Sequence, residues 1–392
     1  MHRLSILFLS VLFMFSGNIS AADKTAHSTT TKSSLATGKL TGNARTKASK
    51  SFQDKYDNRK KLKLRLYSIY KEYAPLIGVK QIGAYLEKKD ASCHGVAHAL
   101  GKVIGEAESD LNTGMQLCGN TCTYACVHGV YKVYFTKLGK NYHTHKPGHD
   151  HSAHTPTAAP IKLNKKELRK FAQDVNNACK DSKSVVADFF KGNCAHGVGH
   201  AMAKISGNTT NATNYCKEFP SKAMRYYCET GVFMELSGGI KNKLFKNTKL
   251  RSEEISLALD YCGSKSNYPS SCLRFLLSRN KSLGQIARFS VLCNLQKPHL
   301  RRHCFNAMGF YSRTYLARNP KEFKFSCSLG KTKIDNKACI SGAAYMKKDQ
   351  TRRKDIKVAC QYTGTSENTQ YCLQQLETFY YKIDNKFLNV IL

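Results

Sequence analysis

Two copies of the pattern His-Gly-Val-x-His contain side chains that can bind a metal ion. The first copy spans His94 to His98 and the second spans His196 to His200. Residues four apart share one face of a helix, with Cβ atoms about 5–6 Å apart, and imidazoles at that spacing can converge on one ion through bonds of about 2.0–2.1 Å. A third His-Gly-Val begins at His128 without a second histidine. We therefore predict a metal site formed by His94, His98, His196 and His200, with His128 as a candidate fifth ligand.

A second cluster of histidines lies in the stretch "NYHTHKPGHDHSAHTPTAAP". Its proline and glycine content predicts a loop, inserted at 141–160. Histidine-rich tracts of this kind bind zinc, copper or nickel loosely, so we expect this loop to capture ions for the helical site. Its metal-capturing side chains are His143, His145, His149, His151 and His154. Imidazole ligands favour zinc or copper as the bound transition metal.

Catalysis would require a general base and an open coordination position beside the metal. Glu106 and Glu108 follow the first motif, and Glu229 and Glu235 follow the second. No fixed spacing ties any of these carboxylates to the histidines, so the pattern favours binding or sensing over hydrolysis. A metal-dependent extracytoplasmic enzyme with Glu106 or Glu235 as base is the alternative.

Sixteen cysteines surround these motifs, and most fall into pairs at short intervals. In each pair the first cysteine follows a stretch with helical apolar spacing and the second precedes another, so a disulfide would join the two helices of an αα-hairpin. Each such bond stabilises the fold by roughly 3 kcal/mol in the chain-entropy model. The predicted pairs are Cys118 with Cys126, Cys179 with Cys194, Cys216 with Cys228, Cys262 with Cys272, Cys293 with Cys304, Cys327 with Cys339, and Cys360 with Cys372.

Two cysteines remain outside this series, Cys93 and Cys122. We expect a disulfide between them that joins two hairpins. The alternative is that Cys93 stays a thiolate and ligates a metal beside His94.

The recurrence of cysteine-flanked helix pairs predicts the fold. The third residue after the second cysteine is often small, which allows close helix packing; examples are Gly129, Gly197, Gly231, Ala307 and Gly342. We predict an all-α fold of disulfide-stapled αα-hairpin repeats over residues 60–392, arranged as a solenoid or toroid.

The amino-terminal residues have the pattern of an export signal. Arg3 precedes an apolar run that ends in small residues, which predicts a signal peptide over 1–22. Residues 23–59 are poor in large apolar side chains, so we expect a disordered basic tether rich in Ser, Thr and Lys. The mature protein is then secreted or periplasmic, and no segment is apolar and long enough to predict a transmembrane protein.

The formal net charge of +35 comes from lysines spread along the whole chain. Without a concentrated basic block, this pattern argues against specific nucleic-acid binding. It allows contact with an anionic cell-surface polymer or protein partner, and a non-catalytic interaction scaffold for such a partner is a further alternative.

The run "CHGVAH" resembles the Cys-His-Gly zinc motif of the lanthionine synthetase cyclases at residues 93 to 95. Those proteins are also helical toroids, so the resemblance implies how helices can present zinc ligands. The chain contains no Trp, so the Trp-Cys motif of that family is absent and its activity is not carried over. The sequence as a whole predicts an exported transition-metal-binding protein, acting as a carrier, buffer or sensor.

Overall fold

A computed structural model describes residues 34–89, 93–119, 121–144, 164–180, 187–206, 208–245, 251–344 and 350–377. These residues are helical with connecting turns and contain no strand, which confirms the predicted all-α class. The predicted signal peptide at 1–22 and most of the insertion at 141–160 lie outside the described residues. No helix among those described has both the length and the apolar character to cross a membrane.

The first part of the chain forms helices α1 to α11. Their bounds are α1 Ser34–Thr37, α2 Gly42–Asp57, α3 Leu66–Ile77, α4 Val79–Lys89, α5 His94–Ala107, α6 Leu111–Cys118, α7 Thr121–Thr144, α8 Lys165–Lys180, α9 Ala187–Ser206, α10 Thr209–Cys216 and α11 Lys222–Leu244. The remainder forms α12 Arg251–Lys265, α13 Pro269–Leu276, α14 Leu283–Asn294, α15 Pro298–Arg318, η1 Pro320–Glu322, α16 Phe323–Ser326, α17 Lys333–Ala344, α18 Gln350–Cys360 and α19 Ser366–Glu377.

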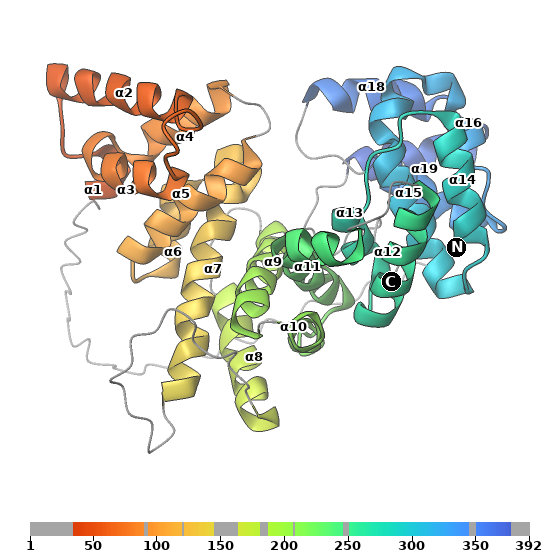
Figure 1. Ribbon diagram of the computed structural model, residues 1–392, viewed down its shortest axis with the longest axis horizontal. Helices are drawn as coiled ribbons and strands as arrows, with labels where there is room; N and C mark the ends of the chain where they lie inside the picture. The colour runs from red at the N-terminus through yellow and green to blue at the C-terminus, as the bar shows by residue number, and fades with distance from the viewer. Residues whose placement is uncertain are drawn as a thin grey trace, which may run out of the picture. The chain divides into compact units, whose positions relative to one another are not determined.

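The helices that contain the second cysteine of each pair pack against one another in chain order. Helix α5 contacts α7, and the series continues through α9, α11, α13, α15, α17 and α19 (Figure 1). In six hairpins the first helix contacts the helix that follows it: α6 with α7, α8 with α9, α10 with α11, α12 with α13, α14 with α15, and α18 with α19. Residues far apart in sequence therefore meet along one succession of helices.

Disulfides join the described hairpins at their turns. Seven are present: Cys93–Cys122, Cys118–Cys126, Cys216–Cys228, Cys262–Cys272, Cys293–Cys304, Cys327–Cys339 and Cys360–Cys372. Six of them join cysteines that the spacing pairs, and the seventh, Cys93–Cys122, is the bond expected between the two remaining cysteines. Cys194 is also disulfide-bonded, but the side chain of its expected partner, Cys179, lies outside the described residues. Seven disulfides indicate an oxidising, extracellular environment.

The bond between Cys93 and Cys122 decides one open alternative. Their Cα atoms lie 5.4 Å apart, within the ordinary range for a disulfide. The sulfur of Cys93 is therefore not available as a thiolate, and the alternative of a Cys93 metal ligand is wrong.

Three helix pairs approach so closely that only glycine fits between them. A Cβ atom placed on Gly231 in α11 would lie 2.0 Å from the carbonyl oxygen of His196 in α9, and one on Gly342 would lie 2.0 Å from that of Asn306. In the α5/α7 pair the same contact joins Gly129 to the carbonyl of His98, at 2.3 Å. His98, His196 and Asn306 therefore occupy equivalent places in the three pairs α5/α7, α9/α11 and α15/α17.

A second regularity places polar side chains along this succession of helices. The residue two places after the second cysteine of a pair is called here the Cys+2 position. It is polar in α7, α9, α11, α13, α15 and α17. These residues are His128, His196, Thr230, Arg274, Asn306 and Ser341, and all are buried. His98 takes the same place in α5, as its contact with Gly129 shows.

The segment expected to be a tether differs from that prediction. Helix α2 lies within it, and its Phe52 and Tyr56 are buried against α3. Their ring centroids lie 6.4 and 6.5 Å from that of Tyr70. The composition of residues 23–59 is poor in apolar side chains, but these two rings, one helical turn apart, bury enough apolar surface to dock the helix.

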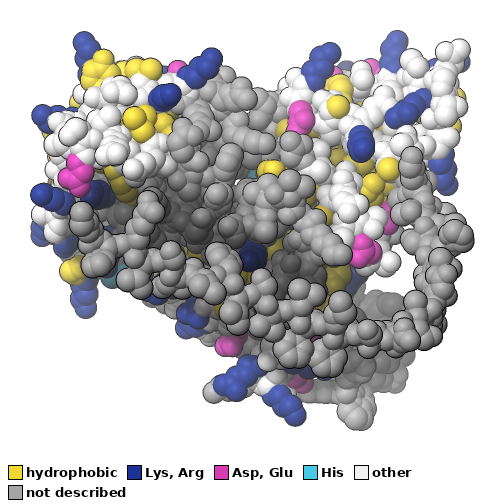
Figure 2. Space-filling model, turned by 180° about the vertical axis from the view of Figure 1, so that it is seen from behind, with side chains coloured by type: hydrophobic (Ala, Val, Ile, Leu, Met, Phe, Trp, Pro, Cys, Tyr) yellow, Lys and Arg dark blue, Asp and Glu magenta, His cyan; other side chains and the backbone are white. Residues whose placement is uncertain are grey.

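The excess positive charge is dispersed in the structure. Figure 2 shows lysine and arginine side chains spread over several parts of the face in view, without a single continuous patch. The expected absence of specific nucleic-acid binding stays a prediction.

Candidate metal centre

Three helices that contact one another in the order α5, α7 and α9 bring five histidines together. Helix α5 contributes His94 and His98, α7 contributes His128, and α9 contributes His196 and His200. The ring of His128 has its centroid 5.4 Å from those of His94 and His98 and 4.5 Å from that of His196. His98 and His200 lie 5.2 Å apart by the same measure. The residues predicted from the two motifs therefore form one cluster.

Within the cluster, two groups of three have ligand atoms that all lie within 4.8 Å of one another. His94, His98 and His128 form one group, and His128, His196 and His200 form the other. His128 belongs to both, so it is the centre of the arrangement and not a peripheral fifth member. The reason is topological, because α7 packs against both α5 and α9.

The two copies of His-Gly-Val-x-His are not structurally equivalent. The second histidine of the first copy, His98, takes the place that the first histidine of the second copy, His196, takes in its own helix pair. The copies are thus offset by one helical turn. His94 lies one turn before the shared place, and His200 lies one turn after it.

The two groups differ in exposure. His128, His196 and His200 are at most 2% exposed, whereas His94 and His98 are partly accessible. A buried imidazole costs free energy unless its polar atoms find partners. The partners of the buried rings therefore indicate which ring nitrogen carries the proton. We call these three residues the buried triad.

Each member of the buried triad directs one ring nitrogen toward an acceptor outside the cluster. His128 Nε2 makes a short hydrogen bond to Oδ1 of the buried Asn193. His196 Nδ1 lies 2.7 Å from Thr230 Oγ1, and that hydroxyl donates to the Tyr227 carbonyl, so the imidazole is the donor. An amide oxygen accepts only, so His128 Nε2 is likewise the donor. These bonds fix the tautomers of both rings.

The third member, His200, is oriented by an ion pair. Its Nδ1 lies 3.0 Å from Glu235 Oε2, and Lys132 Nζ lies 2.5 Å from Glu235 Oε1. Burial raises the pKa of Glu235, but hydrogen bonds and charge from His200 and Lys132 outweigh burial and lower that pKa to about 2. The carboxylate is therefore ionised and accepts the Nδ1 proton. A carboxylate behind an imidazole is the usual support of a metal-binding histidine.

With their outer nitrogens donating, the rings turn the remaining lone pairs inward. His196 Nε2 and His200 Nε2 lie 3.2 Å apart. Two nitrogens bound to one tetrahedral ion at about 2.0–2.1 Å would be roughly 3.3 Å apart. The observed separation is compatible with two ligands on a shared ion.

Protonation of His128 and His196 is disfavoured. Burial lowers the pKa of His128 and of His196 well below the ordinary value, and the neighbouring imidazoles lower both further. Neutral imidazole is the form that binds a metal. The lowered pKa values of His128 and His196 therefore favour the ligating form of these two residues.

The carboxylates considered as catalytic bases are engaged elsewhere. Glu235 orients His200, and its lowered pKa makes it a poor base. Glu106 accepts a hydrogen bond from the Tyr67 hydroxyl at 2.6 Å and lies 3.5 Å from Lys102. Neither residue has the free carboxylate that activation of water requires.

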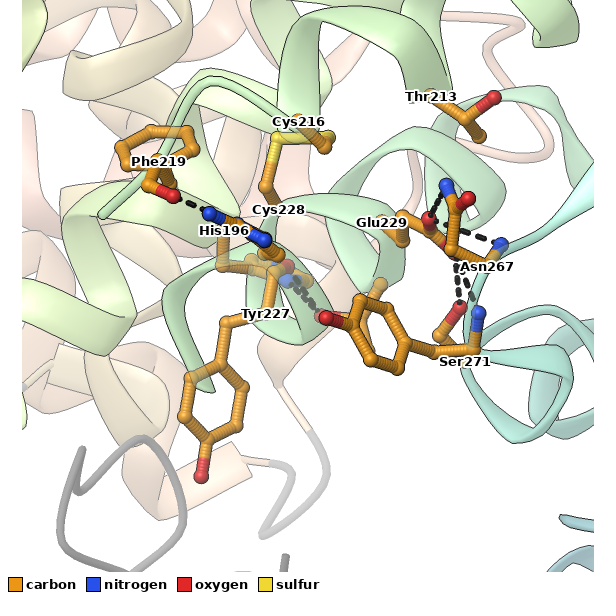
Figure 3. Close-up of a disulfide and its surroundings, with 12 residues drawn as sticks. His196, Thr213, Cys216, Phe219, Tyr227, Cys228, Glu229, Asn267 and Ser271 are labelled. Carbon is orange, nitrogen blue, oxygen red and sulfur yellow. Dashed lines mark hydrogen bonds between the residues drawn. A yellow bond between two sulfur atoms is a disulfide. The ribbon is translucent and has the colours of Figure 1, made fainter. Parts of the chain in front are cut away.

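Glu229 has a structural role. Its buried carboxylate accepts hydrogen bonds from the backbone and side chain of Asn267 and from the hydroxyls of Ser266 and Ser271 (Figure 3). Burial raises its pKa despite these bonds. The residue anchors the turn that leads into α13, next to the Cys262–Cys272 disulfide.

The histidines of the predicted capture loop are not described. His145, His149, His151 and His154 lie outside the described residues, as does the side chain of His143. Their expected role in metal capture remains a prediction.

Sequence reasoning missed two residues that hold the triad, Asn193 and Thr230. Thr230 occupies the Cys+2 position of α11, so the cysteine spacing identifies its place in retrospect. Asn193 directly precedes Cys194 and has no pattern of its own. Comparison of the chain with protein-family models, with curated proteins and with solved structures found no match.

Proposed function

We propose that the histidine cluster binds one transition-metal ion and that the protein serves as an exported carrier, buffer or sensor of that metal. The observation that carries this proposal is the orientation of the buried triad. Three rings donate outward, to Asn193, Thr230 and Glu235, and two inward nitrogens lie 3.2 Å apart. These bonds leave the second nitrogens of His196 and His200 facing each other, and that contact supports a shared ion.

An all-imidazole shell narrows the choice of metal. Calcium and magnesium prefer oxygen ligands, whereas imidazole suits zinc and copper(II). The disulfide at Cys93 leaves no thiolate beside the cluster to favour copper(I). We propose zinc or copper as the bound ion, with His98 and His94 available on the more exposed side to complete the shell.

Delivery of the ion fits the order of the chain. The histidine-rich stretch at 143–154 follows directly from α7, the helix that contains His128. We propose that this stretch collects loosely bound ions and passes them to the cluster. We propose that residues 1–22 act as a signal peptide and that this activity lies outside the cytoplasm, where disulfides form.

Binding is the better supported role, because the two carboxylates predicted as bases, Glu106 and Glu235, are engaged in other contacts. A hydrolytic enzyme would need the open metal position that three ligands leave, together with a base in reach of bound water. The occupied carboxylates of Glu235 and Glu106 favour storage or transfer of the ion over hydrolysis.

The test is elemental analysis of the full-length chain in which the five loop histidines are replaced by Ser. After loading with zinc or copper(II) and dialysis, we expect one equivalent of metal per chain. Replacing His196 and His200 by Asn should remove it, whereas His299→Asn, at an exposed histidine, should leave it in place. Far-UV circular dichroism checks that each variant folds. No retained metal in the loop variant, or equal retention in the His196/His200 variant, contradicts the proposal.

A further inference from the structure

A cavity with a different chemistry lies among α11, α13 and α15. Its volume is about 550 Å³, and four cationic side chains line it: Lys241 from α11, Arg274 from α13, Arg279 just beyond α13, and Arg313 from α15. No Asp or Glu is among the lining residues. Such a concentration of one charge at a concave surface attracts anions.

Two of these cations are held in place by one aromatic ring. The guanidinium carbon of Arg274 lies 4.7 Å from the ring centroid of Phe310, and that of Arg313 lies 4.0 Å from it. Arg274 is only 9% exposed, and its Nη1 lies 3.4 Å from the Tyr226 hydroxyl. Stacked guanidinium groups are preorganised, so less side-chain entropy is lost when they bind a ligand.

Burial lowers the pKa of Lys241, and the negative charge of nearby Glu254 opposes that shift. Glu254 is occupied, because Arg251 lies 3.1 Å from one of its oxygens and the Ser278 hydroxyl donates to the other at 2.6 Å. None of the described residues that line the cavity carries a carboxylate.

The remaining wall is apolar and aromatic. Phe275, Leu277, Phe310 and Tyr311 line the cavity beside the four cations. A ligand that matches both parts combines an oxyanion with a small apolar group. Arginine forks bind phosphate oxygens in pairs, and a phosphate monoester has the charge and the three terminal oxygens to engage several cations at once.

We propose that this cavity binds a phosphate monoester of a small apolar molecule. The Cys+2 position, which supplies imidazoles to the metal cluster from α7 and α9, here supplies the guanidinium of Arg274. None of the lining residues belongs to the histidine cluster. This proposal therefore stands or fails independently of metal binding.

The experiment is isothermal titration calorimetry on the full-length, metal-free protein in EDTA at about 0.1 M salt, where surface charges are largely screened beyond ~10 Å. Phenyl phosphate is the probe, with inorganic phosphate and benzoate as comparators. The test variant is Arg279→Gln with Arg313→Gln. The matched control is Arg288→Gln with Arg318→Gln, which removes the same charge from exposed positions outside the cavity.

We expect phenyl phosphate to bind at one equivalent and more tightly than either comparator. The test variant should weaken it at least tenfold, and the control variant less than twofold. Absence of saturable binding, equal weakening in both variants, or equal affinity for benzoate or inorganic phosphate would overturn the proposal. If the double variant is unstable, the titration is repeated with each single substitution, at the exposed Arg279 or at the partly buried Arg313.

Discussion

The helix pairs α9/α11 and α15/α17 have the same construction and different chemistry. Gly231 receives the carbonyl of His196 in one pair, and Gly342 receives that of Asn306 in the other, both at 2.0 Å. The Cys+2 residues also pair in the same way. His196 Nδ1 lies 2.7 Å from Thr230 Oγ1, and Asn306 Nδ2 lies 3.0 Å from Ser341 Oγ.

The two helix pairs differ in how the remaining polar atoms of Asn306 and His196 are used. The amide of Asn306 also donates to the carbonyl of Ala338 at 3.2 Å, so its polar group is used within the pair. The imidazole of His196 has a second nitrogen, which meets His200 at 3.2 Å. The glycine crossing and the disulfides thus form a common frame. We propose that the residue at the Cys+2 position decides whether this frame presents a metal ligand.

The largest expected effect comes from breaking the frame itself. Gly231→Ala and Gly342→Ala each place a methyl group against a backbone carbonyl, so the two helices must separate. We expect a loss of about 3 kcal/mol or more in the free energy of unfolding for each. Only Gly231→Ala should also weaken metal binding, because only its helix pair positions the buried triad. Urea unfolding and metal titration measure the two effects.

Gly284→Ala is the matched control for these substitutions. A Cβ atom at this α14 glycine meets nothing within 4 Å, so the change should be neutral or slightly stabilising. Equal metal affinity in the Gly231 and Gly342 variants would show that the two crossings do not differ in the way proposed.

A smaller effect is expected from the support of His200. Glu235→Gln keeps the shape of the side chain but removes the charge that accepts the Nδ1 proton and pairs with Lys132. Loss of such a supporting carboxylate lowers metal affinity by about 10- to 100-fold, which competition with a chelator measures. Glu322→Gln, beside α15, removes a carboxylate that accepts from Tyr315 and should leave affinity unchanged. An unchanged affinity in Glu235→Gln would exclude the supporting role.

The smallest effect is a pH dependence of the metal-free protein. The lowered pKa values of His128 and His196 mean that the unfolded chain binds more protons than the folded one below pH ~6.5. Stability is therefore nearly complete above pH ~6.5 and falls as the pH drops, by up to about 1.4 kcal/mol per pH unit for each of these two histidines. Urea unfolding in EDTA between pH 7.5 and 5.5 measures this slope.

His303, in the α15/α17 pair, provides a second test of this pH dependence. Burial also lowers the pKa of His303 in α15, whose Nδ1 lies 2.9 Å from Ser270 Oγ. His303→Gln should reduce the slope without changing metal affinity, whereas replacing His128 and His196 should reduce the slope and abolish binding. A slope that none of these changes affects would mean that other groups control the pH dependence.

Much of the frame could be predicted from the sequence because disulfides leave a direct signal. The cysteine spacing predicts the all-α hairpins and every described pairing except Cys93–Cys122, which was expected because these two cysteines remained, and small residues such as Gly231 indicate the close crossings. The solenoid or toroid remains a prediction. The helix at α2 was missed because two aromatic residues, Phe52 and Tyr56, dock it despite a polar composition.

The cluster was predictable in membership but not in arrangement. The repeated motif identifies His94, His98, His196 and His200, yet it suggests that the two copies are equivalent. The glycine contacts show an offset of one turn, which makes His128 the shared residue. The supports at Asn193 and Thr230 depend on which helices pack together, and local spacing does not contain that information.

The central claim is that imidazoles of the buried triad hold one metal ion, and X-ray absorption spectroscopy tests it most directly. The sample is the full-length chain with Ser in place of the five loop histidines, loaded with one equivalent of zinc. The account predicts at least three imidazole nitrogens at about 2.0–2.1 Å, and loss of this signature in His196→Asn. A shell of oxygen atoms, or a spectrum that His196→Asn leaves unchanged, would contradict it.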